Sequence, residues 1–440
     1  MQNTENKNNR KEASRTRESR QGYACEESNG SFSWTRGSLM RLTGLAVVVC
    51  VVALGGVVMA DALDVSRIEY QGAFKLSGAY SYGGHGSAYY PDGNPTPDPG
   101  EGPGSLFVLG HTWNNNIGQV AIPTTLGKLS DGATVATLTQ ARDLVPPTNA
   151  NPPYAPGHAG GIEYVYGDSH LYFCTHPNGS PSGVQTDLDG KIGGNNVQYS
   201  YVAGPPEVES DWYNLSGVDQ RSIGDSICSI PSDWSTAAGI PDQFVAMSGT
   251  WMPYSRGPRL YAYDGDSPVD HDGNPATHKQ AAATKLIEYG GANVMTDWDR
   301  DDSWQGVAWL ESAGQGAVVF AGTKDITNDG DSSNPDTLHA ALLFYDPGDV
   351  YAAVTGGNPY DPQPYAMLDV QDLLFKDFRF DSVAYDRERN LLFAIDRKDS
   401  NPQVVYVWKI ADPPAPKPVA EPASLSLLGL ALLGLRKKRS

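Results

Sequence analysis

The sequence predicts an all-β fold, a five-bladed β-propeller, and three observations lead to this prediction. The chain of 440 residues holds 48 Gly, 32 Pro and 23 Tyr, which favours many short strands joined by turns. One strand motif recurs at nearly constant spacing. A single unmatched strand precedes the first repeat, and the last repeat lacks one strand.

The recurring motif is a short apolar segment that ends in Gly, Thr, His or Asp. It reads "LFVLGHT" at Leu106, "LYFCTH" at Leu171, "FVAMSGT" at Phe244, "VVFAGTKD" at Val318 and "LFAIDRKD" at Leu392, with separations of 65, 73, 74 and 74 residues. A partner strand precedes each copy: "HGSAYYPDG", "GGIEYVYGD", "DSICSIPSD", "QGVAWLESAG" and "DSVAYDRER". A third and a more polar fourth strand follow, so each repeat predicts one four-stranded blade.

The two ends of the repeat region predict how the ring closes. The fifth copy lacks a fourth strand, because Pro413 and Pro414 follow Ile410. The unmatched strand "RIEYQGAFKL" begins at Arg67 and is expected to complete this last blade, which would remove two free sheet edges. The alternatives are a six- or seven-bladed propeller and a β-sandwich. The propeller domain is predicted over residues 61–411.

The N-terminal region predicts export. Residues 40–60 combine Arg41 with an apolar run that ends in Val58-Met59-Ala60, the pattern of a secretory signal peptide cleaved after Ala60. A retained membrane anchor is the alternative. Residues 1–39 are polar and basic, and are interpreted as a disordered or mis-called extension upstream of Met40.

The C-terminal region is built in four parts. Residues 412–420 are a Pro-rich linker, which should be extended and stiff. The tail 421–440 begins with Glu421 and Pro422 and continues into an apolar run of thirteen residues, Ala423 to Leu435. As a helix this run would be about 20 Å long, short of a bilayer core of about 30 Å. A basic end closes the tail: Arg436, Lys437, Lys438 and Arg439.

These tail residues resemble the PEP-CTERM sorting signal of Gram-negative bacteria, with Ala420-Glu421-Pro422 where the family usually has Pro-Glu-Pro. The resemblance covers about twenty residues of the tail and nothing of the propeller region. It implies an exosortase-type sorting enzyme as a partner and transient anchoring in the inner membrane. It also implies a final location at the cell surface or in the extracellular matrix.

The net charge excludes some classes of binding partner, and the cysteine count excludes a disulfide framework. The formal net charge is -19, which argues against nucleic acid and anionic membrane surfaces. Only Cys174 and Cys228 lie between the predicted cleavage point and the tail, too few for a disulfide framework. Both fall in predicted strands and are expected to be buried free thiols, with a disulfide bridge as the alternative.

Candidate site residues come from the first residue of each inner strand, which should point toward the propeller axis. These residues are His85, Gly160, Asp225, Gln305 and Asp381, with His158 just upstream of the second. His85, His158, Asp225 and Asp381 could hold a divalent cation, and Asp225 and Asp381 are the candidate catalytic carboxylates. Glu163 would join them only in the opposite strand phase. The alternative is a polar ring that binds the blade tops and trapped waters.

Two acidic loops and several aromatic residues are further candidates. The loops Asp264 to Asn274 and Asn328 to Asp336 offer oxygen ligands for Ca²⁺, with solvated turns as the alternative. Aromatic side chains that could stack on sugars are Trp113, Trp212, Trp251, Tyr254, Trp298 and Trp304, although such residues are commonly core. The predicted function is non-catalytic binding of extracellular polysaccharide or a surface protein. The alternative is a hydrolase acting through the central funnel.

Overall fold

The computed structural model describes a large part of the predicted propeller region, and all described residues lie in one compact unit, Gly55–Ser440. The described ranges are 60–76, 80, 86–94, 97–110, 117–128, 140–143, 158–165, 170–176, 196–201, 213–216, 223–240, 244–248, 256–264, 269–270, 279–290, 292–327, 337–375, 380–396 and 403–413. The side chains of some strand residues in these ranges lie outside the description, among them those of His158, Cys174 and Asp225.

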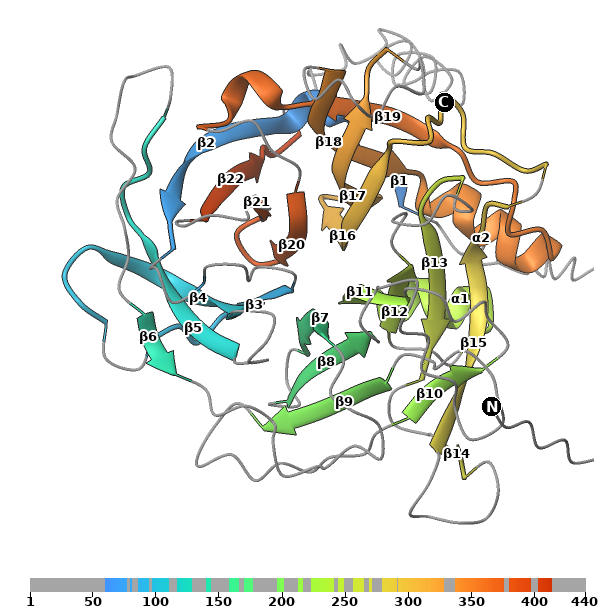
Figure 1. Cartoon of the computed structure of the whole chain (residues 1–440), viewed down its shortest axis with the longest axis horizontal. Coiled ribbons are helices and arrows are strands. Elements are labelled where there is room, and N and C mark those ends of the chain that lie inside the picture. Colours follow the sequence, from blue (N-terminus) through green and yellow to red (C-terminus); the bar gives the residue numbers. More distant parts are fainter. Residues whose placement is uncertain are drawn as a thin grey trace, which may run out of the picture. The chain divides into compact units, whose positions relative to one another are not determined.

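Strands dominate the described chain and form four hydrogen-bonded sheets (Figure 1). The first sheet in chain order is a four-stranded antiparallel meander. Its strands are β3 (Ser87–Tyr90), β4 (Glu101–Leu109), β5 (Ile117–Pro123) and β6 (Gln140–Asp143). It corresponds to the first predicted repeat.

The second sheet has nine strands and contains two consecutive repeats. The first repeat supplies β7 (His158–Tyr164), β8 (His170–His176), β9 (Asn196–Tyr201) and β10 (Tyr213–Ser216). The next supplies β11 (Ile223–Ser229), β12 (Phe244–Ser248), β13 (Arg259–Tyr263), β14 (Val269–Asp270) and β15 (Lys279–Ile287). The outer strands β10 and β15 pair in parallel, from Tyr213↔Lys279 to Ser216↔Ala282, and this pairing joins the two meanders.

The remaining two sheets bring the ends of the domain together. One holds β16 (Ser303–Ser312), β17 (Gln315–Asp325), β18 (Leu338–Tyr345), β19 (Pro364–Asp369) and the short β1 (Asp61–Ala62). The other holds β20 (Phe380–Asp386), β21 (Leu391–Asp396), β22 (Val404–Ile410) and β2 (Ile68–Lys75). Strand β2 is antiparallel to β22, from Ile68↔Ile410 to Lys75↔Val404, so the first long strand pairs with the last (Figure 1).

Two short helices interrupt the strand pattern: α1 (Ser232–Ala238) and α2 (Pro347–Gly356). The side chain of Asp346 caps α2 by accepting from the backbone N–H of Gly348 at 2.7 Å, and Gly357 ends it at φ 76°. The Trp234 indole of α1 donates to the carbonyl of Pro347 at 3.0 Å and packs on Trp309. The described residues also contain two 3-10 turns, η1 (Val65–Arg67) and η5 (Gln371–Leu373).

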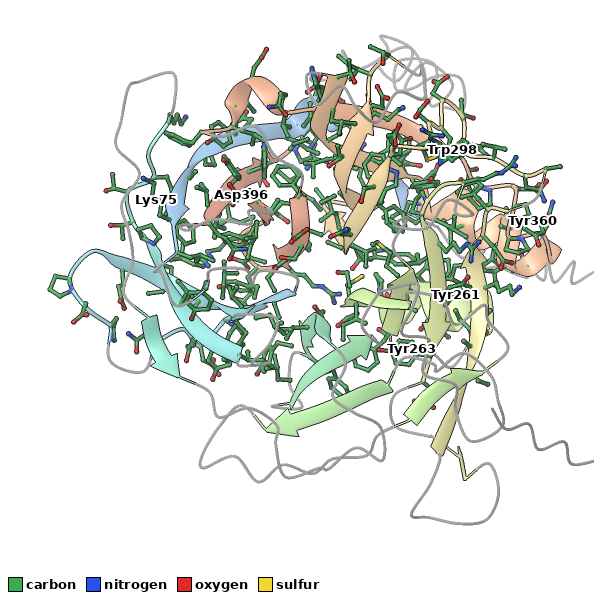
Figure 2. All side chains as sticks on the ribbon, in the orientation of Figure 1. Lys75, Tyr261, Tyr263, Trp298, Tyr360 and Asp396 are labelled. Atoms are coloured by element: carbon green, nitrogen blue, oxygen red, sulfur yellow. The ribbon has the colours of Figure 1, made fainter. Side chains whose placement is uncertain are left out.

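The core lies between successive repeats, where apolar side chains from both sides meet. Aromatic pairs cross these boundaries: Tyr90 with Tyr164 at 5.0 Å between ring centroids, Tyr172 with Phe244 at 4.4 Å, and Tyr89 with Phe393 at 6.0 Å. Tyr261 and Tyr263 on β13, labelled in Figure 2, are also fully buried. Packing between neighbouring repeats is the arrangement expected of sheets placed around a ring.

The described structure confirms an all-β, propeller-like ring, since the sheets surround a common centre (Figure 1). It shows four hydrogen-bonded sheets where the spacing predicts five separate blades. The difference arises at β10 and β15, whose parallel pairing merges two predicted blades into one sheet. The innermost strands of all five repeats contact one another in sequence: β3 with β7, β7 with β11, β11 with β16, β16 with β20, and β20 with β3.

Candidate functional site

Four of the five innermost strands, β7, β11, β16 and β20, have an irregularity near their first residues, and four of the predicted axial residues fall within it. The pairing register shifts between Ala159 and Ile162 in β7, Ile223 and Ser226 in β11, Trp304 and Gly306 in β16, and Phe380 and Ser382 in β20. Gly160, Asp225, Gln305 and Asp381 lie in these shifts and therefore occupy equivalent positions. A β-bulge turns a side chain away from its regular direction. We call this end of the inner strands the bulge end.

A small residue follows each bulge because neighbouring inner strands approach closely there. A Cβ on Gly161 would lie 2.3 Å from the backbone N of Ile227, and one on Gly306 would lie 2.9 Å from that of Val383. The hydroxyl of Ser226 accepts from the Val307 N–H at 3.1 Å, and Ser87 donates to Ser382 at 3.0 Å. Backbone and serine contacts therefore hold the inner strands together around the axis.

The structure describes the predicted axial residues to different extents. Asp381 is 1% exposed and Gln305 is 7% exposed, so both side chains are buried. Gly160 and the backbones of His158 and Asp225 lie at the bulge end, and His158 pairs with His176. His85 lies outside the described residues, as do the side chains of His158 and Asp225. The predicted convergence of imidazoles and carboxylates therefore remains a prediction.

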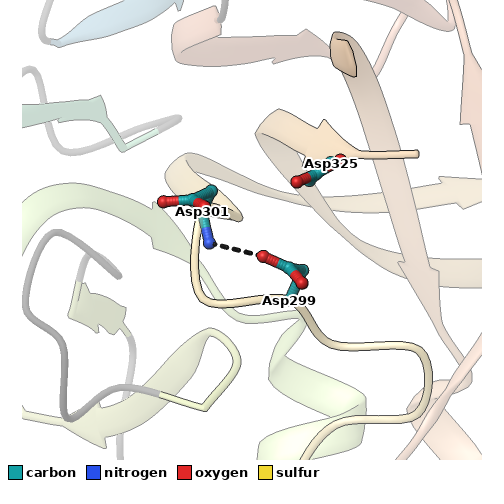
Figure 3. A group of neighbouring side chains, drawn as sticks. All are labelled: Asp299, Asp301 and Asp325. Atoms are coloured by element: carbon teal, nitrogen blue, oxygen red, sulfur yellow. Dashed lines mark hydrogen bonds between the residues drawn. The ribbon is translucent and has the colours of Figure 1, made fainter. Parts of the chain in front are cut away.

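Three carboxylates lie close together at the bulge end of the β16–β17 hairpin. The sequence analysis did not identify this group. Asp299 and Asp301 precede β16, and Asp325 is the last residue of β17 (Figure 3). One carboxylate oxygen from each lies within 4.8 Å of the others. Asp299 and Asp325 are buried and Asp301 is half-buried. The run "DWDRDDS" from Asp297 supplied a signal for this cluster, but the run alone does not indicate that Asp325 joins it.

Asp302 fastens the two segments that carry this cluster. Its Oδ1 accepts from Lys324 Nζ at 3.1 Å and from the backbone N–H of Asp325 at 3.0 Å, while Oδ2 accepts from the Asp299 N–H at 3.0 Å. Lys324 Nζ also donates to the Asp325 carbonyl at 2.7 Å. Burial raises the pKa of Asp302 to about 6, against the lowering effect of these hydrogen bonds and the Lys324 charge.

The two oxygens of Asp325 have different surroundings. Oδ1 accepts from the Thr327 N–H at 2.9 Å and from the Thr327 hydroxyl at 2.8 Å. Oδ2 is buried and has no hydrogen-bond partner among the residues that the structure describes. Burial raises the pKa of Asp325, but hydrogen bonds from Thr327 and Thr337 and the Lys324 charge outweigh it, so the pKa is lowered and the carboxyl stays ionised at neutral pH.

Hydrogen bonds on both sides fix the loop before β16. The Met295 N–H donates to the Arg256 carbonyl at 2.9 Å, and Thr296 donates to Gln363 Oε1 from its N–H at 2.7 Å and its hydroxyl at 2.9 Å. Inside the loop, the Asp301 N–H donates to Asp299 Oδ1 at 3.0 Å. The carboxylates are therefore held in place by the chain itself.

The opposite end of the inner strands carries a different polar group, which we call the Glu163 end. Glu163 Oε1 accepts from the Ser229 N–H at 3.1 Å and the Ser229 hydroxyl at 2.5 Å. Arg387 donates to the Ser229 carbonyl at 3.1 Å. Burial raises the pKa of Glu163, and the Arg387 charge and the Ser229 hydrogen bonds oppose the shift. Cys228 is buried with a free thiol, as predicted, and burial together with the Glu163 charge raises its pKa.

The other sequence candidates divide between described and undescribed parts of the chain. Trp304 is fully buried, which removes it from sugar binding, and Trp298 packs partly on the core with Arg256 6.0 Å from its ring (Figure 2). Trp113, Trp212, Trp251, Tyr254, the loop 328–336 and most of the loop 264–274 lie outside the described residues. So do the signal peptide up to residue 59 and the sorting residues Glu421, Pro422, Arg436, Lys437, Lys438 and Arg439. No helix in the described part of the chain is both long and apolar enough to span a bilayer.

Comparisons with known proteins give no family. No protein-family model matches the chain, and no curated protein matches it. Among solved structures, an α-L-arabinofuranosidase from Lactobacillus brevis aligns at a TM-score of 0.34 and 11% identity, over 80% of this chain and 95% of that one. A chain of Polycomb Repressive Complex 2 from Chaetomium thermophilum aligns at a TM-score of 0.34 and 8% identity, over 77% and 98%. Likenesses this distant carry no argument about function.

Proposed function

We propose that this chain is an exported surface or matrix protein of a Gram-negative bacterium, in which a five-bladed propeller binds polysaccharide or another surface protein without catalysis. The closed sequence of contacts among the five inner strands supports the blade count, with the nine-stranded sheet counted as two blades. The pairing of β2 with β22 supports closure of the ring by the N-terminal strand. Closure would leave no inner edge open to another chain.

The observation that carries the proposal is the burial of Asp381, one of the two candidate catalytic carboxylates. A glycosidase needs two carboxyl groups that reach the glycosidic bond of its substrate. Asp381 is 1% exposed, at the start of β20 where the inner strands pack backbone to backbone. A carboxylate buried in this way is not open to a polymeric substrate in this structure, which supports binding without catalysis. The buried polar residues at this end therefore fit a structural role better than an open catalytic funnel.

Support for export and sorting comes from the sequence. The signal-peptide pattern before Asp61 and the tail from Glu421 stand at opposite ends of the chain, as secretion followed by sorting requires. An exosortase-type enzyme would act on the tail, and the inner membrane would hold it transiently. The Pro-rich linker 412–420 would separate the propeller from the membrane at that stage.

The test of binding without catalysis uses the purified full-length chain on a glycan array and in a parallel hydrolysis assay. We expect retention on one class of glycan without turnover, and unchanged retention by Asp381→Asn. The matched control is Asp372→Asn, which changes an exposed aspartate of η5. Turnover that Asp381→Asn reduces at least about a hundredfold, while Asp372→Asn does not, would establish the hydrolase instead.

Sorting is tested by fractionating a Gram-negative host that contains an exosortase. Replacing Arg436, Lys437, Lys438 and Arg439 by serine should trap the chain before it reaches the surface or medium. A second variant, Glu421→Ala, changes the other half of the signal without altering the basic end. If both variants reach the same fractions as the parent chain, the sorting assignment is wrong.

A further inference from the structure

Three aspartate side chains from two chain segments converge beside the bulge end, and we propose that Asp299, Asp301 and Asp325 bind one Ca²⁺ ion. The segments are the loop before β16 and the end of β17, which the β16–β17 hairpin brings together through the pair Ser303↔Thr323. Binding here requires neither export nor any glycan ligand. It is a different place from the acidic loops and the axial residues that the sequence suggests.

The spacing of the ligand atoms fits a single cation. The three carboxylate oxygens lie within 4.8 Å of one another (Figure 3). Ca²⁺ binds oxygen at about 2.3–2.6 Å, so two ligands on opposite sides of it are about 4.6–5.2 Å apart. All three oxygens can therefore belong to one coordination sphere. The candidate ligands are carboxylates without histidine or cysteine, a set that suits hard cations and not zinc.

The buried Oδ2 of Asp325 points to a ligand independently of the spacing. Asp325 is 0% exposed, and within the described residues Oδ2 has no hydrogen-bond partner. A buried carboxylate oxygen without a partner is costly, and a bound cation removes that cost. Figure 3 shows the Asp325 side chain directed toward the other two carboxylates.

Two basic side chains lie close to the cluster. Lys324, which is buried, donates to Asp302 at 3.1 Å and to the Asp325 carbonyl at 2.7 Å. Arg300 Nε lies 4.0 Å from Asp301 Oδ2, and its side chain is 59% exposed, so water screens this pair. Three carboxylates packed this closely repel one another unless a positive charge sits between them.

The loop is also preorganised for a cation, since the Asp299–Asp301 hydrogen bond and the Asp302 contacts fix both segments without occupying Asp325 Oδ2. An ion that binds a site of this kind pays little ordering entropy. Mg²⁺ demands near-ideal octahedral geometry and retains several waters, so a site with three protein carboxylates on a fixed loop favours Ca²⁺.

The test titrates Ca²⁺ into chelator-treated full-length chain by isothermal calorimetry and follows the melting temperature with and without Ca²⁺. We expect one site per chain and a melting temperature that rises with Ca²⁺ concentration, because the ion binds only the folded state. Asp325→Asn and Asp299→Asn should each weaken Ca²⁺ binding at least about tenfold, since each removes one charged ligand. Circular dichroism in chelator shows whether each variant is folded.

The matched control is Asp297→Asn, which removes the same charge from the same loop. Asp297 is exposed and has φ 56°, a conformation that asparagine tolerates. Ca²⁺ affinity close to that of the parent chain in this variant supports the site. The proposal is overturned if the parent chain binds no Ca²⁺ at millimolar concentration, or if Asp297→Asn weakens binding as much as the other two. Mg²⁺ binding as tight as Ca²⁺ binding would overturn the choice of ion.

Discussion

The two ends of the inner strands both carry acidic groups that are buried or half-buried, and the groups around these carboxylates differ. At the Glu163 end, the carboxylate accepts two hydrogen bonds from Ser229, and Arg387 lies close enough to lower its pKa. At the bulge end, Lys324 donates to Asp302, and one carboxylate oxygen from each of Asp299, Asp301 and Asp325 lies within 4.8 Å of the others.

This comparison suggests two ways in which one fold can compensate the negative charge of a carboxylate that is removed from water. At the Glu163 end the chain itself supplies the compensating charge, through Arg387, which follows β20. At the bulge end, Lys324 and Asp302 form an ion pair within the chain. We propose that the other three carboxylates, those of Asp299, Asp301 and Asp325, bind an external cation. The following variants test whether the two ends differ in this way, beginning with the largest expected effect.

Lys324→Met should be the most destabilising change at the bulge end. The Lys324–Asp302 pair is buried, with side chains 6% and 0% exposed, so the variant leaves Asp302 without its charge partner. We expect a loss of about 3–5 kcal/mol in the free energy of unfolding, measured by urea denaturation in chelator. Lys285→Met is the control, since Lys285 pairs with Glu288 at 2.8 Å but is 37% exposed. It should cost less than about 1 kcal/mol, and equal losses would contradict the buried-pair interpretation.

Arg387→Met should be the next largest change and acts at the opposite end. It removes a hydrogen bond to the Ser229 carbonyl and the positive charge near Glu163 and Glu311, with an expected loss of about 2 kcal/mol. In a Glu163→Gln background, Arg387→Met should lower the free energy of unfolding by less, because the negative charge that Arg387 compensates is already absent. A double-mutant cycle by urea denaturation measures the difference, and strictly additive losses would show that Arg387 does not compensate Glu163.

The sequence predicted the repeat well because its signals are local. Each inner strand begins with a polar or small residue and a second small one, and Gly161 and Gly306 show why: a side chain there would collide with the next strand. The sequence also contains start and end signals for the helix α2, Asp346-Pro347 before it and Gly357 after it. The spacing of the strands does not reveal a helix, so α2 was not predicted. The parallel pairing of β10 with β15 has no local signal, since nothing near Tyr213 specifies Lys279 as its partner.

The candidate site was harder to predict for a related reason. Asp299 and Asp301 lie in a visible acidic run, but Asp325 reaches them only through the register of the β16–β17 hairpin. Four of the predicted axial residues, Gly160, Asp225, Gln305 and Asp381, lie at register shifts of their strands. Burial cannot be read from such an alignment, and the burial of Asp381 is visible only in the folded structure.

Glu163→Gln should have the smallest effect, and its signature is a change in pH dependence. The pKa of Glu163 is raised above its ordinary value of 4.5 in the folded chain, chiefly by burial. A raised folded pKa contributes stability that is present below the unfolded value and is lost as pH rises through the folded value. Glutamine does not titrate and can still accept from Ser229 through its Oε1, so the variant should lack this loss.

The measurement is the urea midpoint of parent and variant at about pH 4 and about pH 8. The variant should gain on the parent as pH rises, while its stability at the lower pH stays within about 1 kcal/mol of the parent, because the hydrogen bonds to Ser229 persist. Glu69→Gln, at an exposed position of β2, should show no such gain. A difference between parent and Glu163→Gln that does not vary with pH would mean that the pKa of Glu163 in the folded chain equals its unfolded value. Arg387 would then fully offset its burial, and the Glu163 end would be a complete ion pair.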